Sequence, residues 1–222
     1  MLCSIPFRPL SFLAVSLALA GASPVAGQIG SRPAEEWALT LESGRRMESL
    51  EIEEVVAEIG LRPGDLVADI GAGTGIFSVP LARAVMPGGR VLSVEVDEGF
   101  LPLIASKARQ ANLDNIQPVL GQFEDPRLPR GDVDVAFFHD VLHHVAERGP
   151  YLERVASYVK PGGRIVVVDY YKNLPGNPHA RQPEMLIGPE DVDGWMRAAG
   201  LRLTRRVEMF EDKFYVIYTK QD

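Results

Sequence analysis

One acidic residue followed by three alternate glycines forms a pattern that can hold a ligand against the backbone. The run DIGAGTG extends from Asp69 to Gly75, directly after a short apolar stretch. Glycine allows a tight turn and a close approach of the backbone to a ligand. Ile76 follows Gly75, so the spacing differs from the G-x-G-x-x-G dinucleotide fingerprint, and the missing Gly-Lys-Ser/Thr excludes a P-loop. Taken alone, the turn is also compatible with a purely structural role.

Two further positions favour a nucleoside ligand. Glu95 ends a second apolar run about 20 residues after the first glycine, where a carboxylate can accept both hydroxyls of a ribose. The polar–apolar pair Gln122-Phe123 follows a third apolar run and suits the amino edge and the face of an adenine. The segment KPGGR, at 160–164, precedes another very apolar run.

The segment FHDVLHH, at 138–144, contains three of the 4 histidines of the chain. His139, Asp140 and His143 are therefore the candidates for a general base or for contact with a substrate. Alternatively, the rings hydrogen-bond to nearby backbone. His139 and His143 have the spacing i, i+4, which suits a metal only if the segment is helical, and we assign no metal here.

The elements that must position these residues alternate along the chain. Near-continuous Val/Ile runs indicate strands buried on both faces, as in a parallel sheet covered by helices. Strands are predicted at 66–70, 91–96, 116–120, 133–138 and 164–169, with helices at 76–85, 99–112, 151–159 and 190–199. This alternation predicts right-handed βαβ units and a Rossmann-like, doubly wound α/β sheet. Two last strands, at 201–209 and 214–219, read as an antiparallel hairpin, and residues 34–60 as amphipathic helices interrupted at 43–44.

Together these motifs resemble the class I S-adenosylmethionine-dependent methyltransferases, of the broad methyltransferase-11/25 type. VADIGAGTG, VLSVEVD, GQFEDPRLP, FFHDVLHHV and KPGGRIVVVD stand in the order of that family, and the resemblance runs from about residue 47 to the end of the chain. It implies a mostly parallel sheet with a terminal antiparallel strand, in the order 3-2-1-4-5-7-6. It also implies S-adenosylmethionine (SAM) as cofactor and methyl transfer as activity.

The resemblance assigns roles to individual residues. Asp69 is expected to hold the methionine amino group. Glu95 and the adjacent Val96 are expected to contact the ribose hydroxyls, and Asp97 is a weaker alternative for this role. His139 is expected at the methionine end. The family often has Asp where this chain has Gln122, whose amide oxygen can still bond the adenine amino group, and Phe123 is expected to supply a backbone N–H and ring contact. The backbone of the turn is expected against the homocysteine part, at Gly71, Ala72, Gly73 and Gly75.

The methyl acceptor is left open by the sequence. Asp140 and Asp169 resemble the two metal-binding acids of catechol-type O-methyltransferases, but Tyr170 stands where that family has Asn, which argues against magnesium. The Pro/Gly-rich stretch 171–183 is expected to be a substrate lid, or else a surface connection. The chain lacks an Asn/Asp/Ser-Pro-Pro-Tyr motif for base methylation, a double-acid hairpin for arginine, and the several cysteines that arsenic methylation needs. A small molecule is therefore expected, with oxygen acceptors ahead of carbon or nitrogen.

Two other function classes compete with this interpretation. A non-catalytic module that binds SAM or its demethylated product, S-adenosylhomocysteine (SAH), would need the same loop. A nicotinamide-dependent oxidoreductase would share the fold and the acidic ribose residue, but it requires the G-x-G-x-x-G spacing.

Composition and the N-terminal segment set the remaining bounds. The 222 residues carry a formal net charge of −7, which argues against a nucleic-acid partner, and the single cysteine, Cys3, excludes a disulfide framework or thiolate metal site. Residues 9–31 lack charge and follow Arg8, so residues 1–27 are expected to be a cleaved signal peptide or an N-terminal anchor with membrane contact. A helical preface is then expected at 28–60 and a SAM-binding domain at 61–222. The expected location is exported or membrane-anchored, with the cytoplasm left open, and no oligomeric state is indicated.

Overall fold

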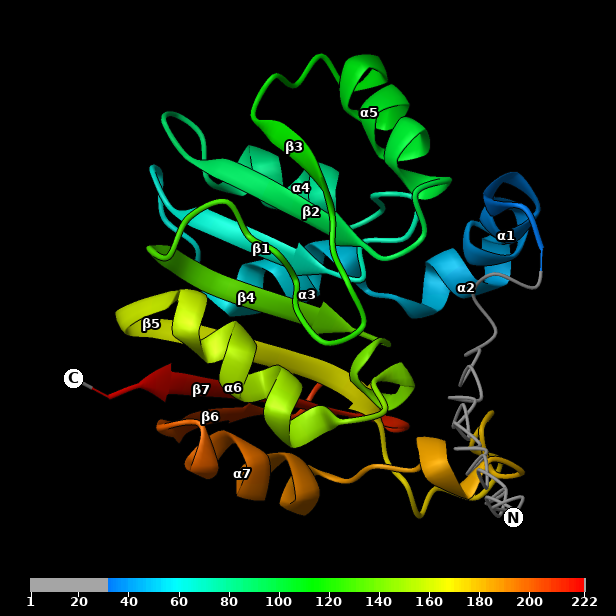
Figure 1. Cartoon of the computed structure of the whole chain (residues 1–222). Helices are drawn as coiled ribbons and strands as arrows, with labels where there is room; N and C mark the ends of the chain where they lie inside the picture. Colours follow the sequence, from blue (N-terminus) through cyan, green and yellow to red (C-terminus); the bar gives the residue numbers. More distant parts are fainter. Residues whose placement is uncertain (1–31, 222) are drawn as a thin grey trace, which may run out of the picture.

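The computed structural model describes residues 32–221, which form a seven-stranded sheet with helices on both faces (Figure 1). The strands are β1 Leu66–Ile70, β2 Arg90–Glu95, β3 Ile116–Leu120, β4 Val133–His139, β5 Val159–Tyr170, β6 Leu201–Val207 and β7 Lys213–Lys220. The helices are α1 Ala34–Leu41, α2 Gly44–Ser49, α3 Ile52–Ile59, α4 Ser78–Ala84, α5 Phe100–Gln110, α6 Arg148–Tyr158 and α7 Pro189–Ala198, with short 3-10 turns η1 Leu142–His144 and η2 Pro183–Met185.

The sheet has the order β3-β2-β1-β4-β5-β7-β6, as the family resemblance predicts. The five strands from β3 to β5 pair in parallel, so their carboxyl ends meet at one edge of the sheet. β7 is antiparallel to both of its neighbours and lies between β5 and β6. The predicted terminal hairpin is therefore confirmed.

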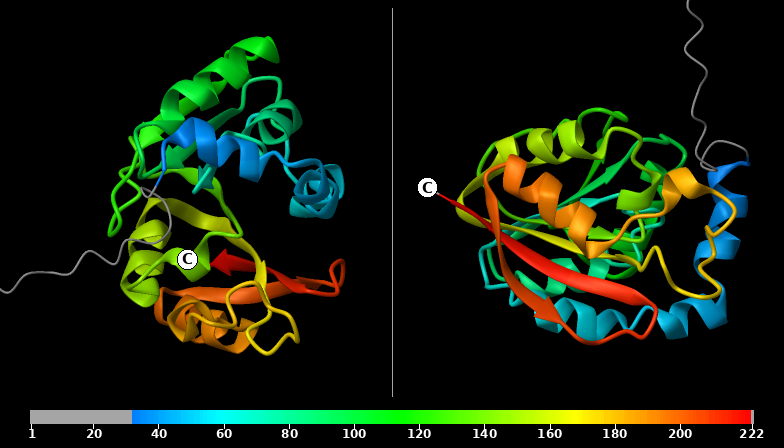
Figure 2. Two further views of the ribbon diagram at one scale, coloured as in Figure 1. Left: turned by 90° about the vertical axis from the view of Figure 1, so that its right-hand side faces the viewer. Right: turned by 90° about the horizontal axis from the view of Figure 1, so that it is seen from below.

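Burial on both faces explains the Val/Ile runs of the central strands. All five residues of β1 are buried, and four residues of β5, Ile165 to Val168, are fully buried. One hydrophobic cluster packs under α6 and α7, and another packs under α3 and α4 on the opposite face (Figure 2). α5 packs against β2 and β3.

The α6–β5 junction differs from the prediction. The helix ends at Tyr158, and Val159 already pairs with Val133 as the first residue of β5, so the Gly-Gly turn lies inside the strand. A Cβ on Gly163 would lie 2.6 Å from Val159 Cγ1 and 3.0 Å from the carbonyl oxygen of Val133. The close approach of the two strands at this irregularity therefore requires glycine, and this is what the turn-like sequence reflects.

The helical preface lies at the edge where the parallel strands end. Residues 34–59 form three helices, with breaks at 42–43 and 50–51; the first adjoins the predicted interruption at 43–44, and the second was not predicted. Figure 1 shows α1 and α2 beyond the carboxyl ends of β1 and β4. The predicted signal peptide or anchor, 1–27, lies outside the described residues. Within residues 32–221, none of the helices is long and apolar enough to cross a bilayer.

Candidate cofactor and active site

The glycine loop connects β1 to α4 at the carboxyl edge of the sheet. Gly71, Gly73 and Gly75 have φ angles of 70°, 56° and 83°, in the left-handed region that favours glycine. A Cβ on Gly71 would lie 2.5 Å from Val141 Cγ2, so the loop packs directly against the turn after β4. A Cβ on Gly73 would lie 3.5 Å from Leu41 Cδ1 of α1, which places the preface beside the loop.

Asp69 is the buried carboxylate at the end of β1. Its Oδ2 accepts a hydrogen bond of 2.6 Å from the Ser78 hydroxyl, and Ser93 donates to Ser78 at 2.8 Å. Burial raises the pKa of Asp69 to about 7, although the bond from Ser78 acts in the opposite direction. The protein thus holds a carboxylate that a cationic group would stabilise.

Glu95, at the end of β2, faces the glycine loop. Its Oε1 accepts the N–H of Gly73 at 2.6 Å, and its Oε2 accepts the N–H of Val96 at 3.1 Å. Burial raises the pKa of Glu95, and these backbone donors only partly offset the effect. The backbone N–H of Ala72 donates to the carbonyl of Val94 at 3.0 Å, which ties the loop to β2.

The turn after β3 places Gln122 and Phe123 near the backbone of Glu95, at the end of β2. The N–H of Gly121 donates to the carbonyl of Glu95 at 2.8 Å, and Gln122 and Asp125 hydrogen-bond to each other through their backbones. Phe123 is 66% exposed, an unusual position for a large apolar ring. The two residues predicted to contact adenine therefore lie on an open turn beside Glu95.

His139 ends β4 and is buried among aromatic rings. Its ring centroid lies 4.5 Å from that of Phe77. Burial lowers the pKa of His139 to about 3, so the ring is neutral at physiological pH. Nδ1 is 3.5 Å from Asp140 Oδ2, but it makes no hydrogen bond there, and with a neutral ring this contact is not a salt bridge.

Asp140 connects three parts of the chain. It adopts a left-handed φ of 55°, and its Oδ2 lies 3.0 Å from Lys213 Nζ on β7 and 3.6 Å from an Arg46 guanidinium nitrogen on α2. Burial works against the charged form, but the Lys213 ammonium and the Arg46 guanidinium favour it, and the pKa of Asp140 is lowered. Sequence reasoning missed both cations. The signal available for Lys213 was its position at the start of the apolar run FYVIY.

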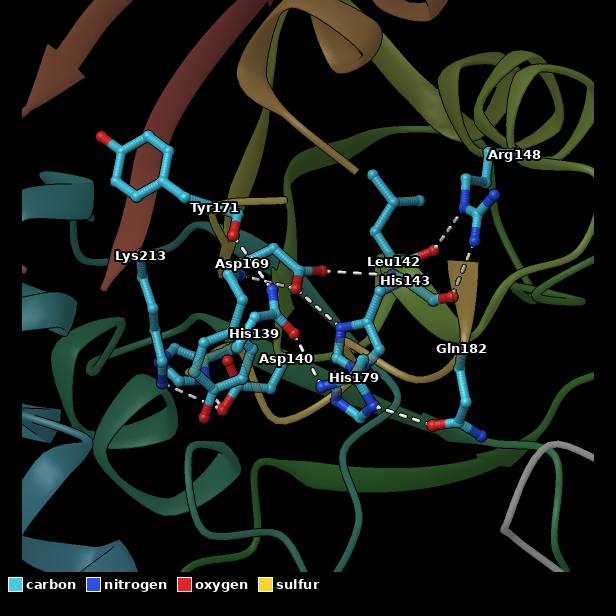
Figure 3. A network of polar contacts seen from close by, with 12 residues as sticks. His139, Asp140, Leu142, His143, Arg148, Asp169, Tyr171, His179, Gln182 and Lys213 are labelled. Carbon is cyan, nitrogen blue, oxygen red and sulfur yellow. Dashed lines mark hydrogen bonds and ion pairs between the residues drawn. The ribbon is translucent and has the colours of Figure 1, made fainter. Parts of the chain in front are cut away.

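His143 lies on η1 and pairs with Asp169 at the end of β5 (Figure 3). Its Nδ1 is 2.6 Å from Asp169 Oδ1, and both residues are buried. His139 ends a strand, so the two histidines do not share a helix face, which removes the condition for their i, i+4 metal pairing. Within residues 32–221, no group of three or more His, Cys, Asp or Glu side chains is arranged to hold a metal ion.

The segment 171–188 lies over the same edge and carries the last histidine. The His179 ring is 4.4 Å from the His143 ring, and the Asn177 side chain fixes the segment by donating to the Tyr171 carbonyl at 2.9 Å. Arg148 joins this segment to η1, because its guanidinium donates to the carbonyls of His143 and Glu184. The stretch expected to be a lid is thus ordered against the candidate site.

A group of buried polar atoms at this edge fits a polar ligand. Within the described part of the chain, several atoms lack a hydrogen-bond partner although water does not reach them: Thr74 Oγ1, both ring nitrogens of His139, Asp140 Oδ1 and His143 Nε2. Such atoms cost free energy unless a ligand satisfies them. The buried carboxylates, the glycine loop and these atoms fit a ligand with a cationic end and ribose hydroxyls, which SAM has.

Comparison with known proteins identifies the family. Residues 68–167 match a family model described as a methyltransferase domain. A crystal structure of a SAM-dependent methyltransferase from Aquifex aeolicus superposes with a TM-score of 0.74 at 26% identity, over 83% of this chain and 97% of that one. The chain thus contains a methyltransferase domain of the class I SAM-dependent type. SAM is the cofactor of this enzyme family.

Other similar proteins agree with the assignment. The chain is 31% identical over 120 residues to the ubiquinone/menaquinone biosynthesis C-methyltransferase UbiE of Ectopseudomonas mendocina, covering 54% of this chain and 46% of that protein. The fold also matches magnesium protoporphyrin IX methyltransferase from Synechocystis with bound SAH, at a TM-score of 0.67 and 19% identity, over 84% and 93% of the two chains. These findings do not favour the non-catalytic alternative. The chain spans less than half the length of the curated relatives that it matches.

Proposed function

We propose that this protein transfers the methyl group of SAM to a small-molecule acceptor. The observation that carries the proposal is the pair of buried carboxylates, Asp69 and Glu95, on either side of one glycine loop. An ammonium group suits the first carboxylate, whose pKa is raised to about 7 by burial, and ribose hydroxyls suit the second. The bound cofactor supplies a methyl group on a sulfonium.

The residues around the loop take the other cofactor contacts in this proposal. The backbone from Gly71 to Gly75 lies along the homocysteine part, and the neutral His139 ring donates or accepts a hydrogen bond at the methionine end. Gln122 and Phe123 close over the adenine from their open turn. This last role accounts for the exposure of an aromatic ring beside Glu95.

The acceptor is proposed to bind beside Asp140 and His143, at the ends of β4 and β5. Methyl transfer is an in-line displacement that depends mainly on holding the acceptor atom about 3 Å from the methyl carbon. Structural neighbours named for magnesium protoporphyrin IX and for 1,6-didemethyltoxoflavin support a small molecule as acceptor.

Calorimetric titration of the full chain tests the cofactor part with three ligands. SAM and SAH contain the amino-acid part, whereas 5′-methylthioadenosine keeps only the nucleoside. Asp69→Asn is expected to weaken SAM and SAH binding by at least tenfold and to leave methylthioadenosine unchanged. Glu95→Gln is expected to weaken all three. Asp114→Asn is the matched control, because Asp114 is exposed on the turn before β3.

Two outcomes would contradict the proposal. Absence of SAM binding at several hundred micromolar would remove the cofactor, and equal losses for all three ligands in both variants would refute the separate roles of the carboxylates. Transfer of labelled methyl from SAM into a cell extract then identifies the acceptor. Binding without transfer to any component of the extract would leave a SAM-binding protein without the proposed activity.

We also propose that residues 1–27 direct the protein out of the cytoplasm, on the basis of their uncharged apolar stretch. Fusion of residues 1–30 to an export-dependent reporter is expected to give an active reporter. An inactive reporter in the cytoplasm would contradict export.

A further inference from the structure

We propose that His143 and Asp169 act together to remove a proton from a hydroxyl group of the methyl acceptor. This inference rests on the proposed methyltransferase activity and names its acceptor class. His143 is the proton acceptor, and Asp169, which acts through it, is a positioning residue.

The hydrogen bonds of Asp169 determine which ring nitrogen is available. Oδ1 lies 2.6 Å from His143 Nδ1 and also accepts the N–H of Tyr170 at 2.8 Å. Oδ2 accepts the backbone N–H of His143 at 3.2 Å. Asp169 is 0% exposed, so the carboxylate is an acceptor held by the protein alone. The short contact to Nδ1 therefore requires the proton on that nitrogen, and Nε2 is left with a free lone pair.

His143 Nε2 belongs to a ring that packs against the His179 ring of the segment 171–188, with the two ring centroids 4.4 Å apart. It is buried and has no hydrogen-bond partner among residues 32–221. The turn that carries this nitrogen contacts the glycine loop, because Val141 packs against Gly71. A buried nitrogen without a partner is destabilising, and an acceptor hydroxyl at this position would supply the missing bond.

His143 is distinguished from the other histidines by its carboxylate partner. All four histidines lie in the described part of the chain, and the other three rings make no hydrogen bond to a carboxylate. Burial lowers the pKa of His139 and of His144 to about 3, and it also lowers the pKa of His179. Of the four rings, only that of His143 is hydrogen-bonded to a carboxylate within residues 32–221.

Arg148 fixes the backbone of the same turn. Its guanidinium donates to the carbonyls of Leu142 and His143, at 3.3 and 2.8 Å (Figure 3). It also donates to the carbonyl of Glu184 on η2. The charged or titratable groups around His143 are thus Asp169 and Tyr170 on β5, Arg148 on α6, His144 on η1, Asp140 before it, and His179 on the segment above.

The base limits the chemical class of the acceptor. A carboxylate acceptor is already deprotonated and has no use for this pair, whereas a hydroxyl must lose its proton. In the proposed step the acceptor oxygen forms a bond to the methyl carbon, and the electron pair of the broken S–C bond remains on sulfur as a neutral thioether. The O–H proton passes to Nε2, which gives an imidazolium paired with Asp169. The product is a methyl ether.

The first test examines the tautomer without any acceptor. Nitrogen-15 NMR of the full chain is expected to show His143 protonated at Nδ1 and bare at Nε2 near neutral pH. Asp169→Asn is expected to abolish this preference, because the amide can donate to Nδ1 and leave the proton on Nε2. Protonation of Nε2 in the wild-type protein would overturn the proposal.

The second test measures labelled methyl transfer from SAM into a cell extract. His143→Gln and Asp169→Asn are each expected to lower the transfer rate by about 10²–10⁴-fold with unchanged SAM affinity. Asp193→Asn, on the outer helix α7, is the matched control. The labelled product is expected to resist alkali and to release labelled methyl iodide with hydriodic acid, as methyl ethers do.

The outcomes separate this inference from the proposed function. Release of labelled methanol by alkali indicates a methyl ester, and a label that resists both reagents indicates transfer to carbon or nitrogen. Either result would overturn the hydroxyl acceptor and leave the methyltransferase intact. Unchanged transfer rates in both His143→Gln and Asp169→Asn would overturn the proposed role of His143 as proton acceptor. Lack of any labelled product, with SAM bound, contradicts the activity itself.

Discussion

Replacement of Asp69 by Asn tests the electrostatics of the cofactor site in the absence of cofactor. Asparagine has nearly the same shape and can still accept the hydrogen bond from Ser78, but it has no proton to lose. Burial raises the pKa of Asp69 from 3.8 to about 7. The wild-type protein therefore holds an ionised group in a place where ionisation is unfavourable, and the variant does not.

The magnitude follows from linkage between protonation and folding. One pKa unit corresponds to about 1.4 kcal/mol, so ionisation of Asp69 costs about 4 kcal/mol more in the folded state than in the unfolded chain. The unfolded chain releases this proton near pH 3.8 and the folded protein near pH 7. Between these two pH values the folded state binds more protons than the unfolded chain, so the free energy of unfolding falls as the pH rises. The stability that protonated Asp69 contributes is fully present below pH 3.8 and is lost above about pH 7.

Urea unfolding of the full chain between about pH 5 and pH 8.5 measures this loss. The free energy of unfolding of Asp69→Asn is expected to exceed that of the wild type by about 1.5 kcal/mol at the acidic end and by about 4 kcal/mol at the basic end. The exposed Asp114→Asn variant removes the same charge and is expected to follow the wild type at every pH.

A stability difference that stays constant from pH 5 to pH 8.5 would refute the reasoning. It would mean that Asp69 ionises near its ordinary pKa despite its burial. A difference that falls with rising pH would show that the folded protein favours the carboxylate, and the site would then need no cationic ligand.

Three further predictions concern the same edge. SAM affinity is expected to fall up to tenfold per pH unit below about pH 7, because Asp69 must lose its proton to pair with an ammonium; calorimetry that finds a flat profile contradicts this. Gly71→Ala is expected to lower the free energy of unfolding by about 1–3 kcal/mol, because position 71 has a left-handed φ. The new methyl group also clashes with Val141, so the double variant with Val141→Ala is expected to recover part of the loss. An unchanged melting temperature in Gly71→Ala would contradict this prediction. Arg148→Ala is expected to lower kcat about tenfold at unchanged KM for SAM, with partial recovery in Arg148→Lys. A rise in KM alone would instead assign Arg148 to cofactor binding.

The fold was predictable because burial leaves a strong trace in the central strands. A strand covered on both faces must be apolar at every position, and the β1 and β5 segments show this directly. The α6–β5 junction was not predictable, because Gly162 and Gly163 are typical of a turn. Gly163 lies inside β5 because β4 approaches it closely, and local sequence does not encode that approach.

The site was predictable where its residues come from strand ends, and not where it depends on long-range pairing. Asp69 and Glu95 follow apolar runs directly, so their place at the carboxyl edge follows from the parallel sheet. The partners of Asp140 come from α2 and β7, more than seventy residues away in the case of Lys213. The pairing of Asp169 with His143 depends likewise on how η1 folds back over β5.

The position of Lys213 makes the candidate site depend on the register of β7. Its strand, β7, is inserted between β5 and β6, and its first residue lies opposite Tyr170. A slip of one residue in this pairing would turn the ammonium group to the other face of the sheet and leave Asp140 without its 3.0 Å partner. The parallel strands form the floor of the site, but the charge balance beside His139 is reached only when the last strand pairs in the correct register.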